Sequence, residues 1–541
     1  MPRTIKPFRD VILSILSGIL LVLPFHYPVL AFLAFVAFIP FFYVLRDKTS
    51  FQAFSYSYLF GITFFLLQSY SLMYVSVLGY LLIVLYLALY FAIFGGLTRS
   101  FLHLSAETPE IYYRSHLKSV FFIPAIWVML EYSRGWVISG IPWALLAYSQ
   151  WKNIPFIQIA DITGAYGISF VICFSNVILF KALQAFSSRK LPWSDNGERA
   201  QRQKYLANLF VLFTGILTLL YLYGLGTLRF RERFYQDPNR VTMRVSSLQG
   251  NIPQEEKWNA SIKNIVFEKY KRLMMMSALE KTDLVVWPET SFPGYLEDEP
   301  LMAVKLRSAI RQCAVSVLVG APTLGELDKG LKFYNSAVLF GPTGEEVKRY
   351  GKMHLVPFGE YMPLEPLLGF VRNFFHVPHF SPGKERVIFE SRSHSSHMVT
   401  TSRFGVLICF EDLFPGTVRS FCREGADFLL NITNDAWFGK TSAPYQHAQS
   451  SVFRAVENRV NVVRAANTGY SCFISPEGRI LSAVEDNGQE IFVSGHKTQD
   501  LVIKRTPSFY TRFGDVFILL IAGLCFLAYQ DKHKRSQYSK L

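Results

Sequence analysis

Long apolar runs alternate with short polar segments over the first 228 residues of the chain. The runs cover residues 10–25, 28–45, 55–75, 77–97, 118–138, 157–180 and 205–227, and an eighth covers residues 513–529. Because a helix needs roughly 20 residues to cross a bilayer, most of these runs are long enough to span it. The pattern therefore predicts a multi-span helical membrane bundle of about eight helices, although the uninterrupted apolar stretch of the eighth, 516–529, is shorter than a usual span.

Basic residues fall in alternate loops between the apolar runs. They occur at the N-terminus, at Arg46 and Lys48, and within 99–118, 181–204 and 532–540. Because Lys and Arg concentrate in cytoplasmic loops, this asymmetry places both termini in the cytoplasm and segment 230–512 on the outer face. Arg229, Arg231 and Arg233 break the pattern, and we expect them to lie along lipid headgroups.

The segment between the seventh and eighth runs has a different pattern. Short β-rich runs at 241–248, 284–287, 315–320, 337–340, 405–409, 428–432 and 460–465 alternate with helical stretches near 258–280, 299–314, 415–424 and 445–459. This alternation predicts a layered α/β domain. The expected division is a membrane part over 1–228, the α/β domain over 229–507, and a C-terminal span with a basic tail over 508–541.

Composition agrees with a membrane protein, since 51% of the residues are hydrophobic and only 18% are charged. The net charge of +15 lies mainly in short loops between apolar runs, so anionic lipid headgroups are the expected partner, and nucleic acid is not. The six cysteines are scattered without a CxxC pair. We expect neither a metal site nor a cofactor, because metal-like spacing and a glycine-rich phosphate loop are both absent from the sequence.

Candidate catalytic residues follow the predicted strands of the α/β domain. Glu289 comes directly after run 284–287, and Cys409 ends run 405–409. Chemistry gathers at strand ends in open α/β folds, and a carboxylate, a thiol and the ammonium of Lys352 together indicate acyl chemistry. Taken alone, Cys409 is equally typical of a small buried core residue, and Lys352 of a solvated loop charge.

The motifs around these residues carry a family resemblance. Glu289 lies in Trp-Pro-Glu, Lys352 in 351–360 and Cys409 in Ile-Cys-Phe-Glu, and further matching motifs lie at 249–254, 431–439, 446–447 and 464–469. In this order they resemble the Glu-Lys-Cys triad of the nitrilase superfamily of carbon–nitrogen hydrolases. More narrowly, they resemble the apolipoprotein N-acyltransferase family, whose members also have a multi-span N-terminal half.

The resemblance implies an αββα sandwich and a two-stage acyl transfer. A phospholipid would acylate Cys409, and the thioester would then acylate the α-amino group of a diacylglyceryl-modified cysteine at the N-terminus of an apolipoprotein. Glu289 would act as the base and Lys352 would stabilise the oxyanion. The expected enzyme is a monomer in the bacterial cytoplasmic membrane, with its catalytic domain on the periplasmic face.

Four residues near the triad are candidates for supporting roles or substrate binding. Glu360 is expected to orient Lys352 or to hold its own loop, and Glu411 to tune the thiol or to anchor the turn after it. Phe410 stands where related enzymes often have Tyr, and its ring is expected to line the acyl pocket. Trp258 is equally consistent with lipid contact and with ordinary core packing. We interpret His447 as structural.

Two further features bear on lipid access. The aromatic segment from Phe358 to Phe380 is expected to dip into the membrane interface as a lid, the alternative being a packed surface loop. Glu131 and Arg134 interrupt the fifth run at helical i, i+3 spacing. They are consistent either with a functional pair buried at membrane depth or with an interfacial pair beyond a helix that ends at Leu130.

Two other function classes remain open at this point. A membrane-tethered amidase would use the same triad with water as the acceptor, but it would need only a single anchor rather than many spans. A transporter or receptor that kept the fold would not depend on the triad.

Overall fold

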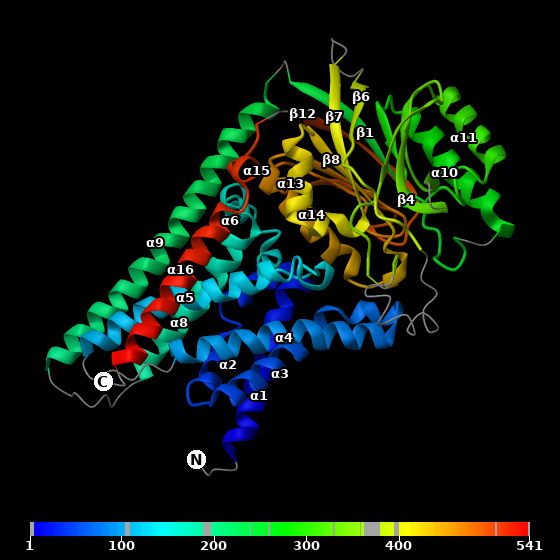
Figure 1. Ribbon diagram of the computed structural model, residues 1–541. Coiled ribbons are helices and arrows are strands. Elements are labelled where there is room, and N and C mark those ends of the chain that lie inside the picture. Colours follow the sequence, from blue (N-terminus) through cyan, green and yellow to red (C-terminus); the bar gives the residue numbers. More distant parts are fainter. Residues whose placement is uncertain are drawn as a thin grey trace. The chain divides into compact units, whose positions relative to one another are not determined.

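The computed structural model describes residues 5–102, 109–187, 196–237, 240–257, 260–327, 330–357, 359–361, 379–393, 400–503 and 506–538 (Figure 1). The chain divides into two compact units. The first contains residues 1–228 and 513–541, and the second contains residues 229–512.

The first unit is helical. Its helices are α1 (Ile5–His26), α2 (Ile39–Leu45), α3 (Ser50–Gln68), α4 (Val77–Leu102), α5 (Pro109–Ser133), α6 (Ile154–Ile157), α7 (Ala160–Thr163), α8 (Ala165–Ser187) and α16 (Val516–Tyr538). Short 3-10 turns η1 (Pro28–Phe35), η2 (Tyr70–Tyr74), η3 (Val137–Ser139) and η4 (Leu146–Gln150) lie between them. The 40-residue helix α9 (Asn196–Tyr235) begins in the first unit, and its last turns belong to the second.

Aromatic side chains fill the core of the helical unit. Trp127 of α5 is in edge contact with Phe38, Phe91 and Phe94, at ring-centroid distances of 4.9 to 5.0 Å. Large apolar side chains also cover the outside of the helices, as at Phe51, which is 78% exposed. Helices that are apolar all round are typical of a membrane environment.

Six helices among the described residues are long and apolar enough to cross a membrane. They cover Lys6–His26, Pro28–Leu45, Ser50–Gln68, Val77–Arg99, Ala165–Phe186 and Arg202–Tyr235. The fifth and eighth runs of the sequence pattern lie in α5 and α16, neither of which is among the six. The apolar part of α16 covers only Val516–Leu527.

The second unit contains two six-stranded mixed sheets. The first sheet has the order β12 (Gly495–Ile503), β1 (Val241–Gln249), β2 (Leu284–Val286), β3 (Ser316–Leu327), β4 (Gly330–Phe340) and β5 (Glu346–Gly351). The second has the order β11 (Ile480–Ala483), β10 (Cys472–Ile474), β9 (Asn461–Ala466), β8 (Phe428–Thr433), β7 (Thr400–Ile408) and β6 (Ile388–Ser393). In each sheet, further strands therefore lie on both sides of a central group of three, β1 to β3 in the first sheet and β7 to β9 in the second.

The central strands of each sheet are parallel, and the outer strands are antiparallel. Strands β1, β2 and β3 run parallel in the first sheet, as do β7, β8 and β9 in the second. Strands β8 and β9 are buried at every position, as expected for parallel strands that are covered on both faces.

Helices cover the outer faces of the two sheets. Helices α10 (Lys263–Ala278) and α11 (Pro300–Cys313) pack on the first sheet, where Tyr270 stacks on Trp287 at 5.1 Å between ring centroids (Figure 1). Helices α13 (Pro415–Arg423) and α14 (Ala443–Asn458) pack on the second sheet. Turns η5 (Ala260–Ile262), η7 (Cys409–Leu413) and η8 (Asp435–Phe438) and helix α15 (Phe509–Phe513) complete the described elements.

The inner faces of the sheets are joined by hydrogen bonds. The Ser247 hydroxyl donates to the carbonyl oxygen of Arg464 at 2.8 Å, and the Asn251 N–H donates to the carbonyl oxygen of Asn467 at 2.7 Å. The layers are thus helix, sheet, sheet and helix. The carboxyl ends of the parallel strands in each sheet meet at one edge, where the segments after β1, β2, β7 and β8 begin.

Candidate active site

Cys409 lies at a sharp turn between β7 and η7. Its φ angle is +53°, which is uncommon for a residue other than glycine, and its side chain is half-buried. The side-chain amide of Asn431 donates to the Cys409 carbonyl oxygen at 3.0 Å and holds the turn from the neighbouring strand. The chain thus reverses at the thiol, as in strand-to-helix turns that present a nucleophile.

Glu411 ties the Cys409 turn to the segment that carries Lys352. It is fully buried, and one carboxylate oxygen accepts the Ile408 N–H at 2.8 Å. The other oxygen accepts the Tyr350 hydroxyl and the Met353 N–H, both at 2.8 Å, as well as the N–H of the residue after Met353. Glu411 therefore anchors two loops to each other.

Glu289 follows β2 and is held by donors from both sheets. Its side chain is 6% exposed. One oxygen accepts the Asn335 side-chain amide from β4 at 2.7 Å, and the other accepts the Asn434 N–H after β8 at 2.9 Å. Gly320 of β3 lies against the backbone of Glu289 so closely that a Cβ there would be 2.8 Å from the Glu289 Cα.

Lys352 lies between two carboxylates and is 1% exposed. Its Nζ is 2.9 Å from the oxygens of Glu360 and 3.5 Å from Glu289 Oε1. The Asn335 side-chain amide donates to Glu360 at 2.8 Å as well as to Glu289, so one amide group bridges the two carboxylates. The Val356 N–H donates to the remaining Glu360 oxygen at 2.8 Å.

The surroundings keep the thiol neutral and the amine charged. Burial raises the pKa of Cys409 well above its ordinary value, and Glu289 adds to this rise, whereas Lys352 opposes it. For Lys352, burial acts to lower the pKa, but Glu360 and Glu289 outweigh it, so the pKa lies above its ordinary value. A neutral thiol needs a base before it can attack a carbonyl carbon, and the Glu289 carboxylate interacts electrostatically with the Cys409 sulfur.

Three side chains of this cluster could not be identified from the sequence. Asn335 is a polar residue inside a strand, which is a weak signal. The Thr433 hydroxyl interacts with the Cys409 side chain and acts to lower the pKa of its thiol. Lys257 is 4% exposed, and its Nζ donates to the backbone carbonyl oxygen of Glu289 at 3.0 Å.

His447 belongs to a buried charge network behind Cys409. Its Nδ1 is 3.0 Å from Asp435 and its Nε2 is 3.1 Å from Asp412, which also accepts from Arg464 at 2.8 Å. Asp435 in turn accepts the Thr433 hydroxyl at 3.2 Å. The network therefore reaches the thiol through Thr433.

The remaining residues predicted to lie near the triad have different surroundings. Phe410 packs against the rings of His354 and Phe414, at 6.2 and 5.3 Å between centroids. Trp258 lies outside the described residues, as does most of the proposed lid, namely residues 358 and 362–378. Among the residues that the structure describes, no group of three or more His, Cys, Asp or Glu side chains is placed to hold a metal ion.

Glu131 and Arg134 are buried inside the helical unit. Helix α5 does not end at Leu130 but continues to Ser133, and the two side chains are 2% and 3% exposed. Their charged groups are 3.7 Å apart, and the Leu146 N–H donates to Glu131 at 2.7 Å. The expectation that the helix ends at Leu130 is therefore wrong.

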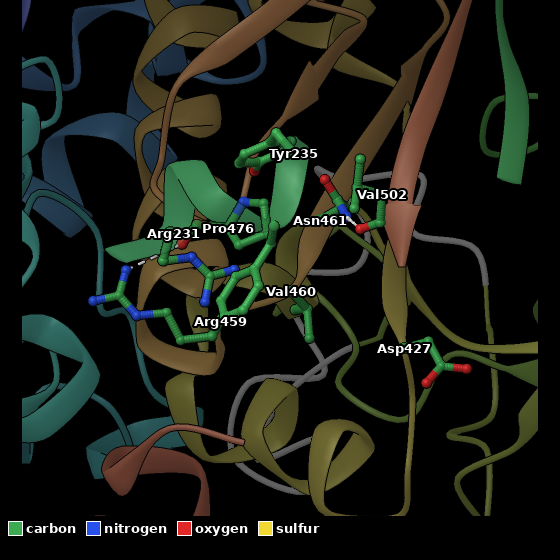
Figure 2. A pocket seen from close by; sticks show the side chains of 9 residues that line it. Arg231, Tyr235, Asp427, Arg459, Val460, Asn461, Pro476 and Val502 are labelled. Carbon is green, nitrogen blue, oxygen red and sulfur yellow. Dashed lines mark hydrogen bonds between the residues drawn. The ribbon is translucent and has the colours of Figure 1, made fainter. Parts of the chain in front are cut away.

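A second hollow of the α/β unit is shown in Figure 2. Arg231, which lines it, pairs with Glu477, and the Tyr235 hydroxyl donates to Glu477 at 2.7 Å. Asn461 donates to the Val502 carbonyl oxygen at 2.9 Å across the strands. The lining contains no member of the Glu289, Lys352 and Cys409 cluster, so this hollow is separate from the candidate active site.

Comparisons with known proteins cover both units. Residues 17–178 match the family model described as apolipoprotein N-acyltransferase N-terminal domain, and residues 244–496 match that of carbon-nitrogen hydrolase. An apolipoprotein N-acyltransferase of Geobacter metallireducens is 36% identical over 530 residues, covering 96% of this chain and 95% of the relative. One of Rickettsia typhi is 29% identical, covering 96% and 98%. An amidase structure from Nesterenkonia sp. is 20% identical with a TM-score of 0.36, covering 50% of this chain and 92% of the amidase.

The His447 network predicts a pH-dependent contribution to stability. Burial opposes charge on the ring, but Asp412 and Asp435 raise the pKa of His447 from 6.5 to about 9. The stabilisation is therefore complete below about pH 6.5 and is lost as the pH rises through about 9. We expect the Tm of the wild-type protein in detergent to fall more steeply over this range than that of His447→Gln.

His496→Gln is the matched control, because His496 also pairs with a carboxylate, Glu280, at 3.0 Å but near the surface. The Tm of His496→Gln should fall with pH as steeply as that of the wild type. Parallel curves for the wild type and His447→Gln would contradict the prediction.

Proposed function

The chain belongs to the apolipoprotein N-acyltransferase family, and we propose that it transfers a fatty acyl group from a phospholipid through Cys409 to an apolipoprotein. The acceptor is the α-amino group of a diacylglyceryl-modified N-terminal cysteine. The observation that carries this proposal is the convergence of Glu289, Lys352 and Cys409, from separate strand ends, on one buried cluster.

The first half-reaction acylates the thiol. Glu289 accepts the proton of Cys409, and the sulfur attacks the ester carbonyl carbon of the phospholipid. A C–S bond forms and the C–O bond to glycerol breaks, while Glu289 returns the proton to the glycerol oxygen. The products are a thioester and a lysophospholipid. The Lys352 ammonium stabilises the oxyanion of the tetrahedral intermediate, together with backbone N–H groups of the turn at Cys409.

The second half-reaction discharges the thioester to the amine. The α-amino nitrogen attacks the thioester carbon, a C–N bond forms and the C–S bond breaks. Glu289 takes the proton that the nitrogen loses and passes it to the Cys409 sulfur. The enzyme thus returns to its starting protonation state, and the same carboxylate serves both halves.

Supporting roles follow from the contacts. We propose that Glu360 positions Lys352 through their ion pair, and that Glu411 positions Cys409 through its bonds on both sides of the turn. Phe410 and Trp258 are proposed to contact the acyl chain, and the segment from Phe358 to Phe380 to act as the lid. No cofactor takes part in the proposed reaction, because the thioester itself carries the acyl group.

For the membrane part we propose eight spans, adding α5 and α16 to the six helices that meet the length and composition of a span. The parts are a membrane domain over 1–228, a catalytic domain over 229–507 and a C-terminal span with a cytoplasmic tail over 508–541. An even number of spans leaves both termini in the cytoplasm and the catalytic domain of this monomeric enzyme on the periplasmic face.

Intact-protein mass spectrometry tests the acyl-enzyme. Wild-type protein incubated with phospholipid alone should gain one fatty-acyl mass, which a diacylglyceryl-cysteine peptide should then remove. Cys409→Ala should gain none, whereas Cys422→Ala, which removes another thiol of the same unit, should behave as the wild type. Discharge by water but not by the peptide would favour an amidase, and an unchanged mass with bound lipid would refute the role of Cys409.

Close packing at Gly320 predicts an effect on the rate. A Cβ there would lie 2.1 Å from the Pro288 carbonyl oxygen, so Gly320→Ala must displace the backbone that carries Glu289. We expect thioester formation to slow by roughly 10²-fold, because misplacing a base by about 1 Å has effects of that size. The control is Gly416→Ala, where an added Cβ meets nothing within 4 Å. Equal rates in both variants would contradict the prediction.

Thiol labelling in spheroplasts tests the orientation. A membrane-impermeant maleimide should label Lys440→Cys in intact spheroplasts, because this exposed position lies in the catalytic domain. Asp47→Cys, exposed in the loop between α2 and α3, should be labelled only after permeabilisation. Peptide mass spectrometry separates these sites from the native cysteines, and the reverse pattern would overturn the orientation.

A further inference from the structure

We propose that Lys257 is a second cation of the active site, which positions Glu289 and stabilises the negative charge that forms on the Cys409 sulfur. The inference rests on the proposed acyl transfer and assigns a role to a residue other than Glu289, Lys352 and Cys409. Its basis is the position of the Lys257 ammonium, which is enclosed with the acid and the thiol.

Lys257 points into the protein. The residue is 4% exposed, and its Nζ donates to the Glu289 carbonyl oxygen at 3.0 Å. Electrostatic interactions link the ammonium to the Glu289 carboxylate and to the Cys409 sulfur. A lysine is seldom buried so completely unless its charge has a use or a partner, and here the nearby groups belong to the site.

The segment that carries Lys257 is fixed to both sheets. It follows β1, and the Asn251 N–H donates to the Asn467 carbonyl oxygen at 2.7 Å. The Ile252 N–H donates to the Asn467 side chain at 2.9 Å, and the Asn434 side-chain amide donates to Gln254 at 2.8 Å. Asn434 also binds Glu289 through its backbone N–H, so the lysine and the acid share one support.

Lys257 offsets negative charge that the ammonium of Lys352 alone does not neutralise. Glu289 and Glu360 both face Lys352, so the single ammonium of Lys352 is shared between two carboxylates. When Glu289 takes the thiol proton, the negative charge moves to the sulfur, and the net charge of the cluster does not change. Without Lys257, the cluster would carry an uncompensated negative charge in every state, which a buried site disfavours.

The charged groups of the His447 network offset one another. Asp435 interacts with the Cys409 sulfur, and it is paired with His447 and Arg464, which also bind Asp412. The pKa of His447 is raised to about 9 against burial by Asp412 and Asp435, so the ring is charged at neutral pH. This network therefore supplies no spare cation for the thiolate.

Lys257 and Lys352 differ in the pH range over which they hold their charge. Burial lowers the pKa of Lys257 to about 8, although Glu289 and Cys409 partly oppose the fall. The carboxylates beside Lys352 instead raise its pKa. A rise in pH through about 8 should thus remove the charge of Lys257 well before that of Lys352.

The test is the single-turnover rate of thioester formation on full-length protein with phospholipid, from about pH 6 to about pH 10. The wild-type rate should fall above about pH 8, as Lys257 loses its proton. Lys257→Met should react roughly 10²-fold more slowly at neutral pH, an effect typical of losing one stabilising group, and should show no fall near pH 8. Lys257→Arg, whose guanidinium stays charged, should restore most of the rate and move the fall to higher pH.

Lys348→Met is the matched control, because Lys348 also donates to a backbone carbonyl oxygen at 3.0 Å, that of Ile388, but is exposed. It should retain the wild-type profile. The proposal requires that the wild type and Lys348→Met form the thioester. If they do, and if both Lys257 variants match their rate and pH profile, the role of Lys257 is refuted. If the wild type itself forms no thioester at Cys409, the proposed function fails instead. If Lys257→Met does not fold, the pH profile of Lys257→Arg is the test. A fall in rate that moves to higher pH supports the proposal, and a fall at the wild-type pH refutes it.

Discussion

The burial of Lys352 together with Glu289 and Glu360 sets the requirements for the surrounding α/β unit. Taking a charged group out of water costs several kcal/mol, and pairing offsets this cost only when the remaining hydrogen-bonding atoms are also satisfied. Here the amide of Asn335 serves both acids, and the backbone N–H of Asn434 serves Glu289. These donors come from different sheets, so the charge cluster exists only when both sheets are formed and correctly registered.

The same constraint explains the strained turn at the thiol. A residue other than glycine at positive φ costs of the order of 1 kcal/mol, and Cys409 adopts such an angle at the end of β7. Glu411 and Asn431 bind on either side of the turn and hold it in place. Because Glu411 also binds the N–H of Met353, the position of the sulfur is coupled to that of the neighbouring Lys352.

Sequence patterns predicted the central strands and the candidate triad, but not the sheet edges or the full cluster. Strand β2 and most of β8 are short apolar runs that end near the site, whereas β1 alternates apolar and polar residues. Edge strands such as β5 and β12 are rich in charged residues and half-exposed, so their composition resembles that of loops. Lys257 and Asn335 were missed because the burial of a polar residue depends on chain segments that are distant in sequence.

The electrostatics of Cys409 fit an enzyme that must store an acyl group in the presence of water. Burial and Glu289 raise the pKa of the thiol, and a thiol of higher pKa is the poorer leaving group from a thioester. In the proposed reaction the acyl-enzyme is therefore slow to hydrolyse until the sulfur is stabilised by a cation or receives a proton. The α-amino group supplies that proton through Glu289 when it attacks, so discharge is tied to the arrival of the amine. The features that make the resting thiol unreactive would thus also slow discharge of the thioester when no proton reaches the sulfur.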